Sequence, residues 1–304
     1  MRYLYYPGCS LKSTGRAYEE SLLAAFAALG IPLEELDDWN CCGATSYMAI
    51  SELKAFAISA RNLAIAQRQG NGSGPVNLMV PCAACYLGLC KAQRYLHEHA
   101  EIREKVDGAL NAAGLRYSDH VRIRHPLDVL INDFGIDALA AKVTHPLAGM
   151  KVACYYGCQI VRPYAEFDDQ HEPTTMDRLM KALGAETVDW PLKTRCCGGS
   201  LTGTVQEVGL RLSYILVREA RKRGADVIAT ACPLCQFNLE CYQKQMSKAF
   251  DDPVHVPVAY FTQLMGVALG GPNRKLGLHR LFIPLSPPTE QPQTATAGGR
   301  HVAS

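Results

Sequence analysis

Ten of the 13 cysteines fall into two ordered sets of five, and each set has the composition of a metal site. In each set a Gly-Cys pair is followed by Cys-Cys-Gly and then by Cys-x-x-Cys. Two adjacent cysteines cannot easily bind one mononuclear ion, because the ring that they would close is small and strained. They can bind two metal atoms of a polynuclear cluster. Five thiolates also exceed by one the number that a tetrahedral zinc ion or an ordinary cubane cluster needs. The predicted ligands are Cys9, Cys41, Cys42, Cys82 and Cys85 in the first set, and Cys158, Cys196, Cys197, Cys232 and Cys235 in the second.

Three cysteines remain outside these sets. Cys154 competes with Cys158 for a place in the second set, but only Cys158 follows a glycine as Cys9 does. We therefore expect Cys154 to be a buried thiol within a strand. Cys90 and Cys241 come shortly after the two Cys-x-x-Cys pairs, and we expect both to be half-buried thiols on helices.

The composition limits the compartment and the partners. A secreted disulfide scaffold is normally smaller than 304 residues and begins with an apolar export segment, whereas the apolar patch before Cys9 is too short for one. No apolar run reaches the roughly 18 residues that a membrane span requires. We expect a cytoplasmic protein with no transmembrane segment whose cysteines bind metal. The 31 basic and 29 acidic side chains give a net charge of +2, so no nucleic-acid partner is expected.

The elements that must position the cysteines alternate between strands and helices. Each Cys-x-x-Cys follows an apolar strand (76–80 and 225–230) and precedes a helix, which spans 86–110 in the first half and runs from after Cys235 to about residue 249 in the second. Further strands are expected at 2–6, 151–156 and 186–189, and further helices at 17–29, 44–69, 127–133, 176–183 and 204–223. This pattern predicts an α/β fold in which the site lies beyond the carboxyl ends of the strands.

The second half of the chain repeats the first. Tyr5-Tyr6-Pro7-Gly8-Cys9 matches Tyr155-Tyr156-Gly157-Cys158, and the segments around the two Cys-x-x-Cys pairs match as well. We expect two similar α/β domains, residues 1–148 and 149–272, with their cysteine loops at strand ends facing a shared cleft. Residues 273–304, of which 287–304 are mostly Pro, Thr, Gln, Ala and Gly, are predicted to form a disordered low-complexity tail.

Non-cysteine residues near the sets are further candidates. Gly43 and Gly198 complete the Cys-Cys-Gly motifs, and we interpret them as cofactor-binding residues that let the backbone approach a bulky inorganic group. Arg195, directly before Cys196, is the first candidate for meeting an anionic thiol substrate, with Arg162 as the second. A structural or solvated arginine is the favoured interpretation of both, so neither is assigned to the site.

The duplicated motifs resemble the cysteine-rich CCG domain family, and more narrowly the B subunit of heterodisulfide reductase, over residues 1–270. The resemblance implies two non-cubane [4Fe-4S] clusters, one on each set of five cysteines. It implies an iron–sulfur protein that reduces or forms a disulfide or sulfane-sulfur substrate by one-electron steps. Some bacterial relatives act within heterodisulfide-reductase-like complexes of sulfur oxidation. The direction of electron flow and the identity of the thiols stay open.

The resemblance also implies partners. Related proteins carry ferredoxin-type cysteine segments in the same chain, and this sequence has none. The expected partners are therefore a ferredoxin-like iron–sulfur subunit of the C type and a flavin-containing subunit of the A type, with a small-molecule disulfide or a sulfur-carrier protein as substrate.

Three alternatives remain. The first is a zinc-stabilised interaction module, with zinc in one site, which leaves one thiolate of each five unexplained. The second is a metal-free dithiol enzyme using Cys82/Cys85 or Cys232/Cys235, which leaves the Cys-Cys-Gly motifs unexplained. The third is a non-catalytic electron-transfer subunit.

Overall fold

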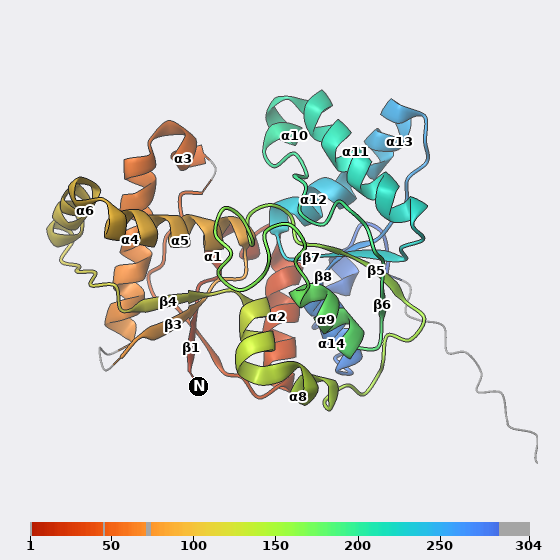
Figure 1. Ribbon diagram of the computed structural model, residues 1–304, viewed down its shortest axis with the longest axis horizontal. Coiled ribbons are helices and arrows are strands. Elements are labelled where there is room, and N and C mark those ends of the chain that lie inside the picture. Colours follow the sequence, from red (N-terminus) through yellow and green to blue (C-terminus); the bar gives the residue numbers. More distant parts are fainter. Residues whose placement is uncertain (1, 45, 71–73, 286–304) are drawn as a thin grey trace, which may run out of the picture.

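The computed structural model describes residues 2–44, 46–70 and 74–285, which form two α/β domains side by side (Figure 1). Each domain contains a four-stranded sheet in which all neighbouring strands are parallel. The predicted α/β repeat is confirmed, since the two sheets have the same strand order. Parallel pairing requires a crossover after each strand, and the helices provide it.

The first domain has the strand order β2-β1-β3-β4. Its strands are β1 (Tyr3–Tyr5), β2 (Leu33–Glu35), β3 (Val76–Met79) and β4 (Val121–Arg124). Its helices are α1 (Gly8–Leu11), α2 (Arg16–Ala28), α3 (Ser46–Ile50), α4 (Glu52–Gln69), α5 (Ala83–Glu98), α6 (Ala100–Ala112), α7 (Pro126–Asp128), the π-helix η1 (Val129–Gly135) and α8 (Ile136–Ala140).

The second domain repeats this order as β6-β5-β7-β8. Its strands are β5 (Lys151–Tyr155), β6 (Glu186–Thr187), β7 (Val227–Thr230) and β8 (Val258–Tyr260). Its helices are α9 (Thr175–Ala182), α10 (Leu201–Thr204), α11 (Gln206–Lys222), α12 (Pro233–Cys241), α13 (Gln243–Phe250), α14 (Phe261–Ala268) and the 3-10 turn η2 (Leu278–Arg280).

In the structure, each of three long helices expected from the sequence is divided into two helices. The 44–69 stretch divides at Ser51, whose side chain accepts a hydrogen bond from the Lys54 N–H and so caps α4. The 86–110 stretch divides at His99, and the stretch from Cys235 to about residue 249 divides at Tyr242. A residue with a non-helical backbone conformation interrupts the first two, and apolar periodicity alone does not show such breaks.

The sequence pattern missed the last strand of each sheet. Residues 111–146 were expected to be an irregular connection, but they contain β4, which pairs with β3 along its whole length. β8 and α14 were not expected at all. Both strands are very short, and in β4 every second residue is an arginine, so their apolar signal is weak.

Helices α2 and α14 form the centre of the interface between the domains (Figure 1). The buried hydroxyls of Ser21 and Thr262 lie 2.6 Å apart, and the rings of Tyr18 and Tyr260 stack with their centroids 4.5 Å apart. On the opposite side of the interface, α9 packs against α8 and α7. In each domain, therefore, the first long crossover helix packs against the last helices of the other domain.

Part of the predicted low-complexity tail is packed against the body of the protein. Leu276 is fully buried, and Arg280 forms two hydrogen bonds of 2.8 Å with Glu20 of α2. Residues 273–285 thus connect the second domain to the first. The rest of the predicted tail, 286–304, lies outside the described residues.

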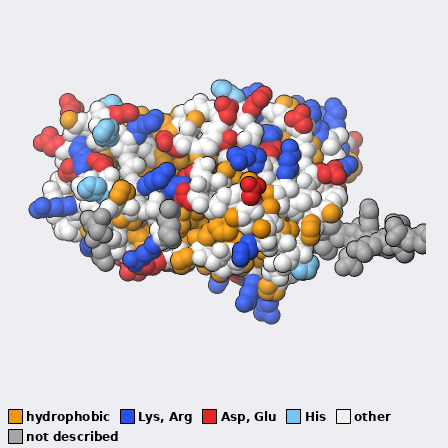
Figure 2. Space-filling model, turned by 60° about the horizontal axis from the view of Figure 1, so that its bottom comes forward, with side chains coloured by type: hydrophobic (Ala, Val, Ile, Leu, Met, Phe, Trp, Pro, Cys, Tyr) orange, Lys and Arg blue, Asp and Glu red, His pale blue; other side chains and the backbone are white. Residues whose placement is uncertain are grey.

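The surface carries both signs of charge. On the face seen in Figure 2, Lys and Arg side chains alternate with Asp and Glu, and hydrophobic side chains gather near the middle. Within the described residues, no helix combines the length and the apolar character that crossing a bilayer would need.

Candidate metal centre

All ten predicted ligands lie on or near loops at the carboxyl ends of strands. Cys9 belongs to α1, which follows β1, and Cys82 is the N-cap residue of α5, which follows β3. Cys232 occupies the corresponding position before α12. Because the carboxyl ends of parallel strands share one edge of a sheet, the cysteines of each domain gather at one edge.

The thiols form one continuous row. The Sγ atoms of Cys42 and Cys85 lie 3.2 Å apart, and those of Cys197 and Cys235 lie 3.3 Å apart. The other thiols also interact with their neighbours through their side chains. In both sets the order from the outer end to the domain interface is the same: the cysteine of Gly-Cys, the two adjacent cysteines, and then the second and the first cysteine of Cys-x-x-Cys. The row is Cys9, Cys41, Cys42, Cys85, Cys82, Cys232, Cys235, Cys197, Cys196 and Cys158.

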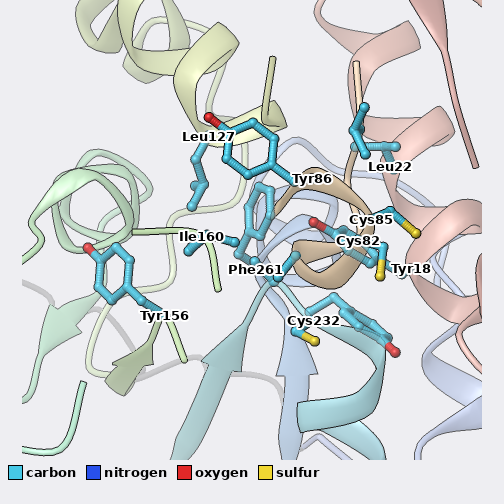
Figure 3. Close-up of a cluster of buried hydrophobic side chains, with 14 of the residues drawn as sticks. Tyr18, Leu22, Cys82, Cys85, Tyr86, Leu127, Tyr156, Ile160, Cys232 and Phe261 are labelled. Atoms are coloured by element: carbon cyan, nitrogen blue, oxygen red, sulfur yellow. The ribbon is translucent and has the colours of Figure 1, made fainter. Parts of the chain in front are cut away.

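The two sets meet where Cys82 of the first domain interacts with Cys232 of the second. Figure 3 shows both sulfur atoms directed to the same space, with Tyr18 beside them. Cys82 is 3% exposed and Cys232 is 2% exposed, whereas Cys9 and Cys196 near the two ends of the row are exposed. The row therefore begins and ends near solvent and passes through the domain interface. We call the meeting point of Cys82 and Cys232 the junction.

Neighbouring thiols shift each other's pKa in opposite directions. A hydrogen bond from Cys158 lowers the pKa of Cys196 to about 2, and the same interaction raises the pKa of Cys158. In the first set, the interactions with Cys41 and then Cys85 hold the pKa of Cys42 well below its usual range, despite burial. Such thiols share protons along the row, and a bound metal takes the place of those protons because its ligands are thiolates.

Two glycines that sequence reasoning did not select lie against the sulfurs. A Cβ atom on Gly8 would be 2.9 Å from the Sγ of Cys85, and a Cβ on Gly157 would be 3.3 Å from the Sγ of Cys235. Both residues have a positive φ, 67° and 68°, which favours glycine. The repeated Gly-Cys pair was the signal that pointed to them.

The two glycines predicted to bind the cofactor also have a packing role. A Cβ on Gly43 would be 2.6 Å from the Ile58 side chain, and one on Gly198 would be 3.1 Å from the backbone of Gly209. Both glycines are therefore needed where the loop passes the following long helix. Their N–H groups point at sulfur, at 3.4 Å from Cys41 and 3.3 Å from Cys196.

A tyrosine and a serine hold each Cys-Cys loop. The Tyr6 hydroxyl donates to the Asn40 carbonyl, and the Tyr155 hydroxyl donates to the Arg195 carbonyl, both at 2.7 Å. Tyr6 therefore corresponds to Tyr155, one position away from the pairing expected from the sequence. The buried hydroxyls of two serines donate to the second cysteine's carbonyl in each loop, from Ser59 to Cys42 and from Ser213 to Cys197.

One polar contact exists only in the second set. Asn238, three residues after Cys235, donates its amide N–H to the Sγ of Cys197 over 3.6 Å and to the Gly199 carbonyl over 2.8 Å. Three residues after Cys85 the first domain has Gly88, which lies beside Cys42 and has no side chain to donate. Among the described residues, no side-chain amide has the corresponding contact in the first set.

The remaining cysteines lie outside the row, as predicted. Cys154 is fully buried in β5, and Cys90 and Cys241 are half-buried on α5 and α12. Burial raises the pKa of Cys90 and of Cys241 to about 12, so both are protonated thiols at neutral pH.

The two candidate arginines have different surroundings. Arg162 donates to the Gln170 carbonyl and to the Thr194 hydroxyl, which gives it a structural role in the loop after β5. Arg195 is exposed, and no hydrogen bond or ion pair of its guanidinium occurs with any described residue. It lies next to the exposed Cys196 and remains available to an anion.

The donor set fits an iron–sulfur group. Soft thiolates are the ligands of such clusters, and the N–H groups directed at Cys41, Cys42 and Cys196 are the hydrogen bonds that tune them. Among the described residues, no three His, Cys, Asp or Glu side chains are grouped so as to hold a single metal ion. Surface hollows of about 370 and 720 Å³ lie elsewhere, beside β6 and between α5 and β4.

Exposed apolar side chains follow each Cys-Cys loop. Tyr47 and Ile50 lie on α3, Val205 lies between α10 and α11, and Val208 lies in the first turn of α11. Helices α3 and α10 project on the same side of the molecule (Figure 1). Ile50 is 82% exposed, which is unusual for an isoleucine and is typical of a contact surface.

Comparisons with known proteins agree on one family. The model of the CCG cysteine-rich domain matches residues 3–90 and again 152–240. The chain is 31% identical to the 8-methylmenaquinol:fumarate reductase membrane anchor subunit of Wolinella succinogenes, over 92% of this chain and 96% of the relative. It is 29% identical to a protein of Archaeoglobus profundus described as like the B subunit of heterodisulfide reductase, over 91% of this chain and 94% of the relative. It is 27% identical to the B subunit of the ferredoxin:CoB-CoM heterodisulfide reductase of Methanosarcina mazei, over 90% of this chain and 91% of the relative.

A solved structure has the same fold. A hypothetical protein from Helicobacter pylori superposes with a TM-score of 0.77 at 18% identity, over 94% of this chain and 52% of that one. The chain spans about half the length of that protein.

Proposed function

Since the chain belongs to the family of CCG cysteine-rich domain proteins, we propose that it is the iron–sulfur subunit of a heterodisulfide-reductase-like complex. In this proposal the first set of five cysteines holds one non-cubane [4Fe-4S] cluster and the second set holds another. The continuous row of ten thiols is the single observation that carries the proposal, because it brings both sets to one buried junction.

The reaction would reduce, or in reverse form, a disulfide or a sulfane-sulfur group at the junction. Reductive cleavage of a disulfide consumes two electrons and, at neutral pH, up to two protons, and it yields two thiols. When bound, iron–sulfur clusters supply electrons one at a time. A substrate between the two sets would therefore receive one electron from each side. The buried position of Cys82 and Cys232 excludes water from that place.

Access for the substrate is expected near the second set. Cys196 is exposed, and Arg195 beside it presents an unpaired guanidinium. A guanidinium binds carboxylate, sulfonate or phosphate groups with several N–H donors. We expect Arg195 to bind the anionic part of a small thiol or the surface of a sulfur-carrier protein.

Partner subunits would approach the exposed ends of the row. The proposed partners are a ferredoxin-like subunit and a flavin-containing subunit in the cytoplasm. Ile50 lies on α3 and Val208 on α11, shortly after the two Cys-Cys loops in the sequence, so a subunit docked there would be near both sets. Replacement of Ile50 by Glu should weaken co-purification of the electron-donating subunit without changing the iron content.

The direct test is the metal content of anaerobically purified and reconstituted protein. Two filled sets give about eight iron and eight sulfide per chain, with a brown colour. Iron below half of that value would count decisively against the proposal. A colourless protein with tightly held zinc would instead support a zinc-stabilised module.

A second candidate is an electron-transfer subunit without catalysis of its own. It is favoured by the 31% identity to a fumarate reductase anchor subunit. The two candidates differ in their response to thiols. A catalytic subunit changes its electron paramagnetic resonance (EPR) spectrum when a thiol binds at the junction, whereas a simple carrier does not.

A further inference from the structure

Three buried hydroxyl groups near the junction have no hydrogen-bond partner. They are the side-chain hydroxyls of Tyr18, Thr230 and Tyr260, and among the described residues no other buried side-chain nitrogen or oxygen lacks a partner. Native proteins leave few buried polar groups unpaired, because each one costs about 1–3 kcal/mol. Three such groups in one region therefore indicate a missing acceptor.

The three residues come from both domains but are neighbours in the structure. Thr230 and Tyr260 are partners in the register of β7 and β8, so their side chains leave the same face of the sheet. The ring of Tyr18, from α2 of the other domain, stacks on Tyr260 at 4.5 Å with an angle of 8° between the rings. All three residues are 0–1% exposed.

The group faces the sulfurs of the junction. Tyr18 lies beside Cys82 and Cys232 in Figure 3, Tyr260 stacks on Tyr18, and Thr230 precedes Cys232 by two residues. Neither tyrosine hydroxyl is within hydrogen-bond reach of a sulfur, so both can donate to an atom that occupies the space beside the two thiols.

We propose that Tyr18, Thr230 and Tyr260 form a hydrogen-bond donor site for an anionic sulfur atom held at the junction. This inference rests on the proposed function. The acceptor is either a sulfur of the metal group or the thiolate of a bound substrate; both are soft anions that accept O–H hydrogen bonds. The hydroxyls donate hydrogen bonds without giving up their protons, so no covalent step involves them.

The test uses the full chain, purified anaerobically and reconstituted, with the variants Tyr18→Phe, Tyr260→Phe and Thr230→Val. Phenylalanine keeps the stacked ring and removes only the hydroxyl. The matched control is Tyr156→Phe, because the Tyr156 hydroxyl is buried in the second domain but donates to Asp177 at 2.7 Å. Iron content and circular dichroism are measured first, followed by EPR-monitored redox titrations with and without 2-mercaptoethanol as the probe thiol.

Two results would support the proposal. A midpoint potential shifted to more negative values without thiol shows that the hydroxyls serve the metal group, because they stabilise its reduced, more negative form. An unchanged potential with thiol binding weakened about three- to tenfold shows that they serve the substrate thiolate.

Two results would overturn it. If all three variants match the wild type and Tyr156→Phe in both titrations while carrying normal iron, the hydroxyl site is wrong and the proposed function stands. If the wild type itself binds no iron after reconstitution, the proposed function fails, and the hydroxyl site fails with it.

Discussion

The two domains share one scaffold but surround their cysteines with different chemistry. The residue that caps the helix after the last strand is His125 in the first domain and Tyr260 in the second. Both rings are buried and both stack, His125 on Phe167 and Tyr260 on Tyr18. Both nitrogens of His125 have hydrogen-bond partners, whereas the Tyr260 hydroxyl has none.

The same contrast recurs at other equivalent positions. Two residues before Cys-x-x-Cys the first domain has Val80 and the second Thr230, and three residues after it the first domain has Gly88 and the second Asn238. In each pair the second domain alone supplies a side chain that can donate a hydrogen bond, and the amide of Asn238 donates to the Sγ of Cys197. Hydrogen bonds to cluster sulfurs raise the reduction potential. The second set should therefore accept electrons from the first.

The largest loss of iron and activity is expected from two single variants, each of which removes one thiol from one of the two sets. Cys42→Ala and Cys197→Ala should each lose about half of the iron, because each of these thiols is the middle one of its set of five. Activity should fall at least about 100-fold in both, since neither set alone supplies two electrons. Metal analysis and EPR-monitored titration of the remaining set check this.

These variants also test whether the two sets differ in reduction potential. The set that remains in Cys42→Ala, which is the second, should titrate at a higher potential than the set that remains in Cys197→Ala. Cys90→Ala and Cys241→Ala are the controls, since both thiols lie outside the row. Equal potentials for the two remaining sets would contradict the comparison.

A second difference concerns the helices after the two Cys-x-x-Cys pairs. Five residues after the pair, α5 has Cys90 and α12 has the carboxyl of Glu240, which is 2% exposed. Burial raises the pKa of Glu240 from its usual 4.5 to about 7. The folded protein therefore prefers the protonated carboxyl, and its contribution to stability is complete below about pH 4.5 and is lost as the pH rises through about 7.

Glu240→Gln should remove this pH dependence. The wild type should lose about 2 kcal/mol of stability between about pH 5 and 7.5 relative to the variant, because the neutral amide of the variant has no charge to bury. Thermal unfolding of the loaded protein across this range measures the effect, with the exposed Glu207→Gln as control. Parallel curves for wild type and Glu240→Gln would refute the assignment.

The glycines against the sulfurs should give a smaller and graded effect. Alanine at position 8 or 157 meets the same backbone strain of about 1–2 kcal/mol, because both φ values are positive. The added Cβ would be 2.9 Å from sulfur in the first set and 3.3 Å in the second. Gly8→Ala should thus lose more iron than Gly157→Ala, as metal analysis would show. The reverse order would mean that sulfur contact does not decide the loss.

The elements that could be predicted from the sequence are those with a strong local sequence pattern. The ten cysteines and the strands before Cys82 and Cys232 were evident, because Cys-Cys-Gly is rare and the strands are continuous apolar runs. β4 and β8 were not, since they owe their stability to neighbouring strands and not to their own short sequences. Tyr18 and Tyr260 belong to different domains, and only tertiary structure brings their rings together.

The smallest predicted effect comes from exchanging one amide between the sets. Asn238→Gly should lower the potential of the second set by about 20–60 mV, the equivalent of one hydrogen bond of about 0.5–1.5 kcal/mol for a one-electron couple. Gly88→Asn should raise the potential of the first set by a similar amount, because a Cβ at residue 88 meets only ordinary contacts, 3.4 Å from Ala44. EPR-monitored titration of each variant resolves shifts of this size. If both exchanges left the potentials in place, the amide would serve only the Gly199 loop, and the inequality of the two sets would have to come from the hydroxyls at the junction.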